Sequence, residues 1–183
     1  MSKKLFAAAL LAGLSVVATP VLAEGLKFLP ILESGYKAEP TLAVSAGVMQ
    51  ASAGRDQSMA VYGLELSMNC GLVQTADNRI RTHLALNRVD QSGLKATALE
   101  LSPRYTVPLG GGFSFGAGPA LAWVKADAER GDKDLFGYGA AAGVAYRSGH
   151  YFSGIDLRYL NTDRREAVGL ENWTLAVKLG VNF

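Results

Sequence analysis

Length, composition and charge together exclude several classes of protein. The chain has 183 residues, of which 49% are hydrophobic and 19% charged, so it is long enough for one folded domain and is no disordered polyelectrolyte. Basic and acidic residues are equal in number once Lys3 and Lys4 are set aside. Because such a neutral chain offers no electrostatic footprint for nucleic acid, we expect no nucleic-acid partner.

The first 23 residues have the features of a secretory signal peptide. Lys3 and Lys4 form a charged start, and residues 5–17 are apolar and rich in Ala and Leu. Pro20 then breaks the helix ahead of Val21-Leu22-Ala23, a suitable cleavage site. A membrane anchor is the alternative, but the apolar run is shorter than the ~20 residues that a spanning helix needs. We therefore predict a signal peptide at 1–23 and export through the periplasm.

Residues 24–39 lack any regular alternation of apolar and polar residues. Pro30 interrupts the segment, and Pro40 follows it directly. We predict a periplasmic N-terminal lead-in here, with a short amphipathic helix as one form that it can take.

From Pro40 onward, apolar and polar residues alternate repeatedly with a period of two. In the last segment one series is Trp173, Leu175, Val177, Leu179, Val181 and Phe183, and the other includes Asn172, Thr174, Lys178, Gly180 and Asn182. Strands place successive side chains on opposite faces, so each such segment is a strand with one apolar face. Eight strands can be placed, at about 40–51, 58–69, 78–88, 94–106, 112–125, 135–147, 150–161 and 171–183.

The connections between these strands alternate in character. Residues 108–111 and 147–150 have the composition of tight turns, whereas 126–133 and 161–169 are longer and charged. Short turns at one end and longer polar loops at the other are typical of a transmembrane barrel. A soluble barrel or sandwich would also have short, regularly spaced strands, so the orientation of the apolar face must decide.

The polar face carries unusually small residues in two strands. They are Ser114, Gly116, Gly118, Ala120 and Ala122 in one, and Gly137, Gly139, Ala141, Gly143 and Ala145 in the next. Glycine weakens a solvent-facing strand but fits inside a narrow eight-stranded barrel. The larger residues of this face would then form a mixed-charge network in the lumen: Glu65, Arg79, Arg81, His83, Glu100, Arg104, Asp156, Arg158 and Lys178. Both signs are present, so these charges can pair.

Aromatic residues on the apolar face fall into two groups. Tyr105, Phe113, Phe115, Tyr146, Tyr151 and Phe183 lie toward the end that would hold the termini. Tyr62, Trp123, Phe136, Tyr138, Tyr159 and Trp173 lie toward the other end. Two aromatic belts around an aliphatic band indicate a barrel that spans a bilayer. We therefore predict an all-β protein, a closed antiparallel transmembrane β-barrel of about eight strands in an up-and-down meander, over residues 40–183.

The sequence from Pro40 to Phe183 resembles the small outer-membrane barrels of the OmpA and OmpX type. The resemblance rests on the segment from Ser102-Pro103-Arg104-Tyr105 to Gly118-Pro119 and on the alternating ending closed by phenylalanine. It implies that the barrel assembly machinery reads the last strand, through Trp173, Val177, Leu179, Val181 and Phe183. OmpA has a peptidoglycan-binding domain after its barrel; this sequence ends at Phe183, so that function is not expected.

Candidate catalytic and metal-ligating residues are few. Two histidines and one cysteine, Cys70, provide no zinc-type ligand cluster. Outer-membrane lipid A deacylases use a His and a Ser two apart on a strand, but His150 and Ser153 are three apart and point to opposite faces. His83 is expected to be a hydrogen-bonded interior residue. We predict no catalytic residue, no metal and no cofactor.

Three functions remain open from the sequence. The first is a non-enzymatic barrel of the Gram-negative outer membrane with a structural, surface-interaction or envelope-integrity role. The second is a narrow pore for small solutes, and the third is a lipid-modifying enzyme. The expected partners are outer-membrane lipid, lipopolysaccharide and the barrel assembly machinery.

Overall fold

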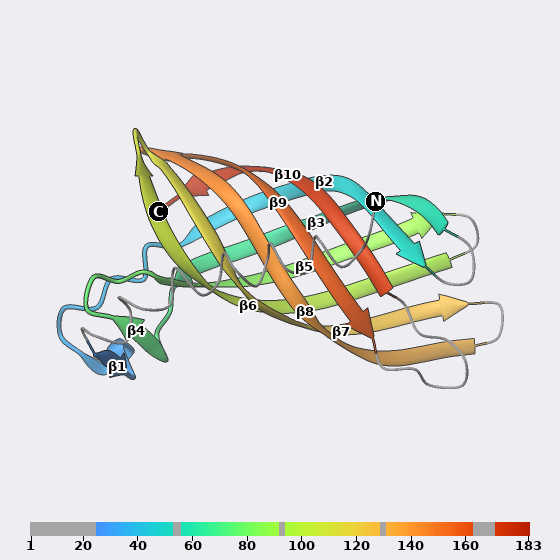
Figure 1. The fold of residues 1–183 in the computed structure, drawn as a ribbon, viewed down its shortest axis with the longest axis horizontal. Helices are drawn as coiled ribbons and strands as arrows, with labels where there is room; N and C mark the ends of the chain where they lie inside the picture. The colour runs from blue at the N-terminus through green and yellow to red at the C-terminus, as the bar shows by residue number, and fades with distance from the viewer. Residues whose placement is uncertain (1–24, 53–55, 92–93, 129–130, 163–170) are drawn as a thin grey trace, which may run out of the picture.

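A computed structural model describes residues 25–52, 56–91, 94–128, 131–162 and 171–183 (Figure 1). The predicted signal peptide and its cleavage site lie outside these residues, as does most of the predicted loop at 161–169. Within the described part of the chain, no helix is long and apolar enough to cross a membrane.

Eight long strands form one closed antiparallel barrel, which confirms the predicted fold. They are β2 (Thr41–Ser52), β3 (Asp56–Asn69), β5 (Ile80–Gln91), β6 (Leu94–Gly110), β7 (Phe113–Ala128), β8 (Gly131–Ser148), β9 (Tyr151–Thr162) and β10 (Glu171–Asn182). Each pairs with the next along the chain, and β10 returns to β2. The predicted strands match these eight, with ends that differ by a few residues.

The closing pair of strands is in continuous register. Residues from Thr41 to Ser52 pair with those from Asn182 back to Glu171. The Thr41 hydroxyl donates to the Asn182 side chain at 2.9 Å, and the Phe183 amide donates to the Pro40 carbonyl at 2.9 Å. The barrel therefore has no free edge, which is the condition for strands to lie in lipid. We call the end that holds Pro40 and Phe183 the terminal end.

The loop predicted at 126–133 is wrong in its extent. Strands β7 and β8 continue to pair through this segment as far as Ala128 and Gly131, so only residues 129–130 separate them. Charged residues suggested a solvated loop, but a hairpin that extends into water also carries them. Cross-strand hydrogen bonding does not require the strand to be apolar.

Alternation along each strand corresponds to an inner and an outer face. In β10 exposed and buried residues alternate from Glu171 to Leu179, with Leu175 and Val177 each 55% exposed on the outside. The small residues of β7 and β8 line the lumen as predicted, and Ala120, Ala122 and Ala141 are almost fully buried there. The outer face thus presents its apolar side chains outward, the reverse of a soluble barrel.

Glycine on the inner face makes room for a charged neighbour. Gly143 pairs with Asp156 across β8 and β9, and a Cβ added at Gly143 would overlap the Asp156 carboxylate. At Gly139 an added Cβ would overlap the carbonyl oxygen of Tyr159 on the adjacent strand. The small residues therefore permit close approach of backbones and leave space for long side chains from other strands.

The lumen has two halves of different polarity, which the sequence analysis did not predict. The half nearer the terminal end contains charged residues. Toward the opposite end, inward-facing apolar residues form a core: Ala51, Met59, Val61, Val89, Ala120, Ala122, Val124, Leu135, Ala141 and Leu160. The expected charge network therefore fills only part of the barrel, and packed hydrocarbon fills much of the rest.

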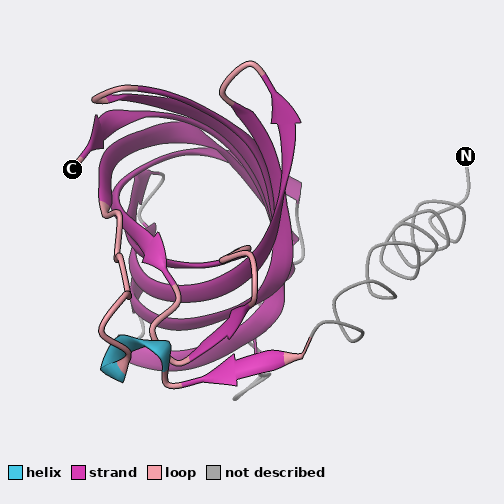
Figure 2. Cartoon of the chain, turned by 90° about the vertical axis from the view of Figure 1, so that its left-hand side faces the viewer, coloured by secondary structure: helices cyan, strands magenta, loops and turns pink. Residues whose placement is uncertain are grey.

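A small substructure lies at the terminal end of the barrel, and we call it the end module. It contains β1 (Leu26–Phe28), the 3-10 turn η1 (Pro30–Leu32) and β4 (Val73–Thr75), with β1 and β4 paired antiparallel. Figure 2 views the barrel from this end and shows the module at the edge of the wall. The amphipathic helix suggested for residues 24–39 does not form. Pro30 supplies no backbone donor, and Leu29 before it has a left-handed φ of 54°.

Candidate functional site: the charged lumen

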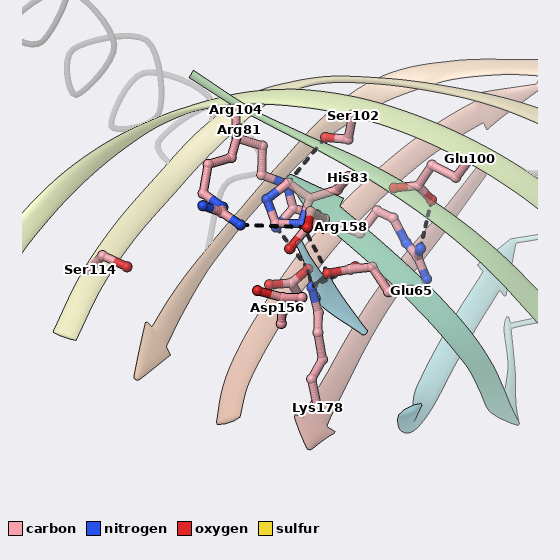
Figure 3. A network of polar contacts seen from close by, with 12 residues as sticks. Glu65, Arg81, His83, Glu100, Ser102, Arg104, Ser114, Asp156, Arg158 and Lys178 are labelled. Carbon is pink, nitrogen blue, oxygen red and sulfur yellow. Dashed lines mark hydrogen bonds and ion pairs between the residues drawn. The ribbon is translucent and has the colours of Figure 1, made fainter. Parts of the chain in front are cut away.

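Five ionisable residues from five strands meet inside the barrel, and we call them the lumen charge cluster. They are Glu65 (β3), His83 (β5), Arg104 (β6), Asp156 (β9) and Lys178 (β10), drawn in Figure 3. Each stands at an inward position of its strand, so period-two alternation alone brings all five into the lumen. Only barrel closure brings β10 next to β2 and so within reach of β3.

Lys178 is the centre of the cluster. Its ammonium group donates to the two carboxylate oxygens of Glu65 at 2.8 and 2.7 Å and forms an ion pair with Asp156 at 2.5 Å. The Arg104 guanidinium donates to the same Asp156 oxygen at 2.8 Å. Two cations and two carboxylates thus neutralise one another, as buried charges require.

Histidine and serine extend this cluster. The Nδ1 atom of His83 lies 2.9 Å from Glu65 Oε1, and the imidazole is buried. The Arg104 Nε atom donates to the Ser102 hydroxyl at 3.2 Å, and that hydroxyl donates to the Pro119 carbonyl at 2.9 Å. The carboxylates and the guanidinium are therefore held by several hydrogen bonds each, which fixes their positions.

A second ion pair lies further along the barrel axis. Arg158 of β9 donates to Glu100 of β6 at 2.6 Å, and Glu100 is 1% exposed. This pair stands between the lumen charge cluster and the apolar core. Among the described residues, Arg158 Nε and Asn87 Nδ2 are buried without a hydrogen-bond partner at this level.

Two arginines of the predicted network lie elsewhere. Arg81 is buried near the terminal end and donates to Asn69 Oδ1 at 2.9 Å and to the Glu39 carbonyl at 2.7 Å. It therefore ties the lead-in segment to the barrel. Arg79 precedes β5 at the rim, where its side chain is 30% exposed and forms an ion pair with Asp77. The sequence placed both in the central network because alternation gives the face of a residue but not its depth.

The rim around Arg79 is itself well bonded. Burial alone would raise the pKa of the Asp77 carboxyl, but hydrogen bonds from Thr75 and Arg79 and the charge of Arg79 outweigh it and lower that pKa. The Thr75 hydroxyl also accepts from the Arg79 amide at 2.9 Å. The turn before β5 is therefore a fixed structure.

Arg147 is a lumen residue that sequence reasoning missed. It extends inward from β8, donates to the Ser114 hydroxyl at 3.2 Å and lies 5.1 Å over the ring of Phe152. Its odd number matches the inward register of Gly143 and Ala145, which was the available signal. Arg147 lies where the predicted strand at 135–147 meets the predicted turn at 147–150, and the predicted lumen network does not include it.

Small cavities remain between the side chains of the described residues. One of about 20 Å³ is lined by members of the lumen charge cluster, and one of about 10 Å³ lies beside Glu65 and Asp156. The third, about 50 Å³, lies in the apolar half, with Val61 and Leu160 in its wall. Because a single water needs roughly 10–15 Å³ by this kind of measure, each has room for a few waters at most.

Histidines and potential metal ligands are sparse among the described residues. No group of three or more His, Cys, Asp or Glu side chains there could hold a metal ion. His150 lies exposed in the turn between β8 and β9. His83 has Ser67 opposite it on β3, but the buried Ser67 hydroxyl has no hydrogen-bond partner among the described residues.

The residues predicted as an assembly signal all point outward from the last strand and its end. Their exposed fractions run from 42% at Trp173 to 74% at Phe183. Trp173 also packs against Tyr159, with ring centroids 4.8 Å apart.

Comparison with solved structures identifies the class of fold. Neisserial surface protein A matches with a TM-score of 0.62 and 15% identity, over 79% of this chain and 97% of that one. The N-terminal β-barrel domain of Pseudomonas aeruginosa OprF matches with a TM-score of 0.51 and 15% identity, over 80% and 100%. No protein-family model and no curated protein matches the sequence. The chain has the fold of the eight-stranded outer-membrane β-barrels, with no extra domain beside the barrel in its described part.

Proposed function

We propose that this protein is an outer-membrane barrel with a closed lumen, and that it serves a structural, surface-interaction or envelope-integrity role. The lumen charge cluster carries this proposal. Arg104 of β6 reaches Asp156 of β9, three strands away around the barrel, and Lys178 of β10 joins that carboxylate to Glu65 of β3, so side chains from separate parts of the wall meet inside the lumen. A neutral, hydrogen-bonded set of this kind stabilises the barrel and obstructs a column of water.

The outer surface supports a location in a lipid bilayer. Exposed aliphatic residues such as Leu64, Leu86 and Leu157 lie between exposed aromatics at the two ends. Such a surface is insoluble unless lipid covers it. The fold, which is that of outer-membrane barrels, supports a location in the outer membrane. A protein at that location would need a signal peptide, export through the periplasm and delivery by the barrel assembly machinery. Outer-membrane lipid and lipopolysaccharide would then be its immediate partners.

Planar-bilayer recording of the refolded protein tests the closed lumen. The unmodified chain should insert, as judged by a heat-dependent shift of its gel band, and should show no steady conductance. The matched variant is Lys178→Met, which keeps the length of the side chain but leaves Glu65 without its cation. Brief openings in that variant alone would support the proposal. Robust conductance of the unmodified protein would overturn it.

A narrow conduit is the second candidate, and the arrangement of the cavities favours it. The 10 Å³ cavity shares Asp156 and Lys178 with the 20 Å³ cavity, and it shares Arg158 with the 50 Å³ cavity. The three cavities thus follow one another along the lumen. Lys178 lines two of them. Steady conductance of the unmodified protein would establish this function.

A lipid-modifying enzyme is the least supported alternative, and we propose that the protein is not an enzyme. Lipid would have to enter a packed lumen to reach His83, whose side chain is 10% exposed. Lipid A hydrolysis by the purified protein that is lost on changing His83 or His150 would overturn this view.

A further inference from the structure

The end module exposes an unusual amount of apolar surface for so small a structure. Six of its large apolar side chains are more than one-third exposed: Leu26, Phe28, Leu29, Ile31, Leu32 and Leu72. Phe28 reaches 72% and Leu32 reaches 80%. Clustered exposure of this kind marks a contact surface, because isolated apolar residues are common on proteins but a contiguous set is not.

The module is amphipathic across its two-stranded sheet. Phe28 pairs with Val73 and Leu26 with Thr75, so these residues share one face. Lys27 pairs with Gln74 on the other face, and Lys27 also forms an exposed ion pair with Glu33 at 3.5 Å. One face is therefore largely apolar and includes the exposed Phe28, whereas the other is polar, with Lys27 exposed and Gln74 buried against the start of β5.

This module is held in place by hydrogen bonds. The Leu29 amide donates to the Leu72 carbonyl at 2.8 Å, which joins the two apolar stretches. The Gln74 side chain is fully buried and bonds both backbone groups of Ile80 at the start of β5, at 2.9 and 2.7 Å. The exposed residues therefore belong to a structure that is fixed to the barrel wall.

The position of the module indicates what covers it. It lies at the terminal end, at the edge of the barrel wall and not across the lumen (Figures 1 and 2). Its anchor, Ile80, begins the strand whose outward residues Leu84 and Leu86 are exposed in the aliphatic band. The module is thus attached where a strand of the proposed lipid-facing surface begins.

We propose that the end module is an interfacial anchor, whose apolar residues insert into the lipid leaflet around the terminal end of the barrel. This inference rests on the proposed membrane location. Amphipathic helices with Phe and Leu on one face lie in the plane of the bilayer interface, and the same gain from burial of apolar side chains applies to the exposed Phe28 and Leu32 of this module. The anchor would set the depth of the barrel in the bilayer.

Tryptophan scanning with brominated lipid tests the anchor in the full mature chain. Trp123→Phe and Trp173→Phe remove the native fluorescence, and Phe28→Trp or Lys27→Trp then places one probe on either face of β1. The two positions are adjacent and both exposed, so they differ mainly in the face they occupy. Each variant is refolded into vesicles of brominated phospholipid, in which the bromine atoms are attached to the acyl chains close to the headgroups.

If the end module is an interfacial anchor, bromine should quench the tryptophan fluorescence of Phe28→Trp at least threefold more strongly than that of Lys27→Trp. The emission of Phe28→Trp should also lie at shorter wavelength. Equal, weak quenching of both probes would overturn it. Short-wavelength emission of Phe28→Trp without bromine quenching would also overturn it, because that result indicates a protein contact such as a second copy of the chain. The gel shift on heating is scored in the same samples. A barrel that fails to insert contradicts the membrane location, whereas an inserted barrel without quenching contradicts the anchor alone.

Discussion

Replacing Lys178 with methionine should be among the most destabilising single changes in the lumen. The substitution keeps the volume of the side chain and removes only its charge and its donors. Asp156 would keep Arg104 at 2.8 Å, but Glu65 would keep only His83, at 2.9 Å. A buried carboxylate would thus lose its principal cation. Removing one partner of a buried ion pair costs about 3–5 kcal/mol in the free energy of unfolding.

The double variant Lys178→Met/Glu65→Gln distinguishes the loss of the ion pair from a general disruption of packing as the cause of the lower stability. It removes the stranded charge, and replacement of a whole buried pair is often nearly neutral. We therefore expect it to be more stable than Lys178→Met alone, by about 1–3 kcal/mol of coupling. Lys95→Met is the matched control at an exposed site. Its ion pair with Asp90 at 4.0 Å should contribute no more than about 1 kcal/mol.

Urea titration of the refolded protein in vesicles, followed by tryptophan fluorescence and by the gel shift on heating, measures these differences. A loss below about 1 kcal/mol in the free energy of unfolding for Lys178→Met, equal to that of Lys95→Met, would refute the reasoning. Lys178 would then contribute no more than a solvent-exposed ion pair does. A double variant that is no more stable than the single one would refute it as well.

Other predictions concern the faces, the second ion pair and the leader. Val177→Arg, which places a charge on the outward face, should lower the free energy of unfolding by about 2–4 kcal/mol if it lies near the middle of the bilayer. Ala176→Ser points inward and should cost little; equal costs in urea titration would mean that the faces are reversed. Glu100→Ala should destabilise the barrel or produce a small leak in bilayer recordings, and a fully stable, silent variant would contradict its place in the closed lumen. N-terminal sequencing of the exported protein should begin at Glu24, and a mature chain that retains residues 5–17 would contradict the predicted signal peptide.

Much of the barrel could be predicted from the sequence because its strands obey a strict period of two. Alternation from Trp173 to Phe183 identified the last strand, and small residues such as Gly143 showed which face lies inside. Both signals are local, since a side chain in a strand can point only to one face or the other. Most charged residues of the lumen were found by the same rule, and Arg147 is the exception.

Depth and partnership could not be predicted, because closure of the barrel decides them. Glu65 and Lys178 are 113 residues apart and meet only because β10 pairs with β2, which in turn pairs with β3. Arg81 follows the same alternation as His83, yet its partner is the carbonyl of Glu39 in the lead-in. Strand register and tilt determine these contacts, and neither can be predicted from the alternation of residues within one strand.

The sequence by itself determined that eight strands exist, which residues face inward, and that apolar side chains cover the outside. Only the tertiary structure decided that the lumen divides into a charged half and an apolar half, and that residues 26–32 pair with 71–75 to form the end module. The physical reason is the range of the interactions. Alternation acts between neighbours in the chain, whereas the height of a residue in the barrel depends on how all eight strands are staggered around the closed sheet.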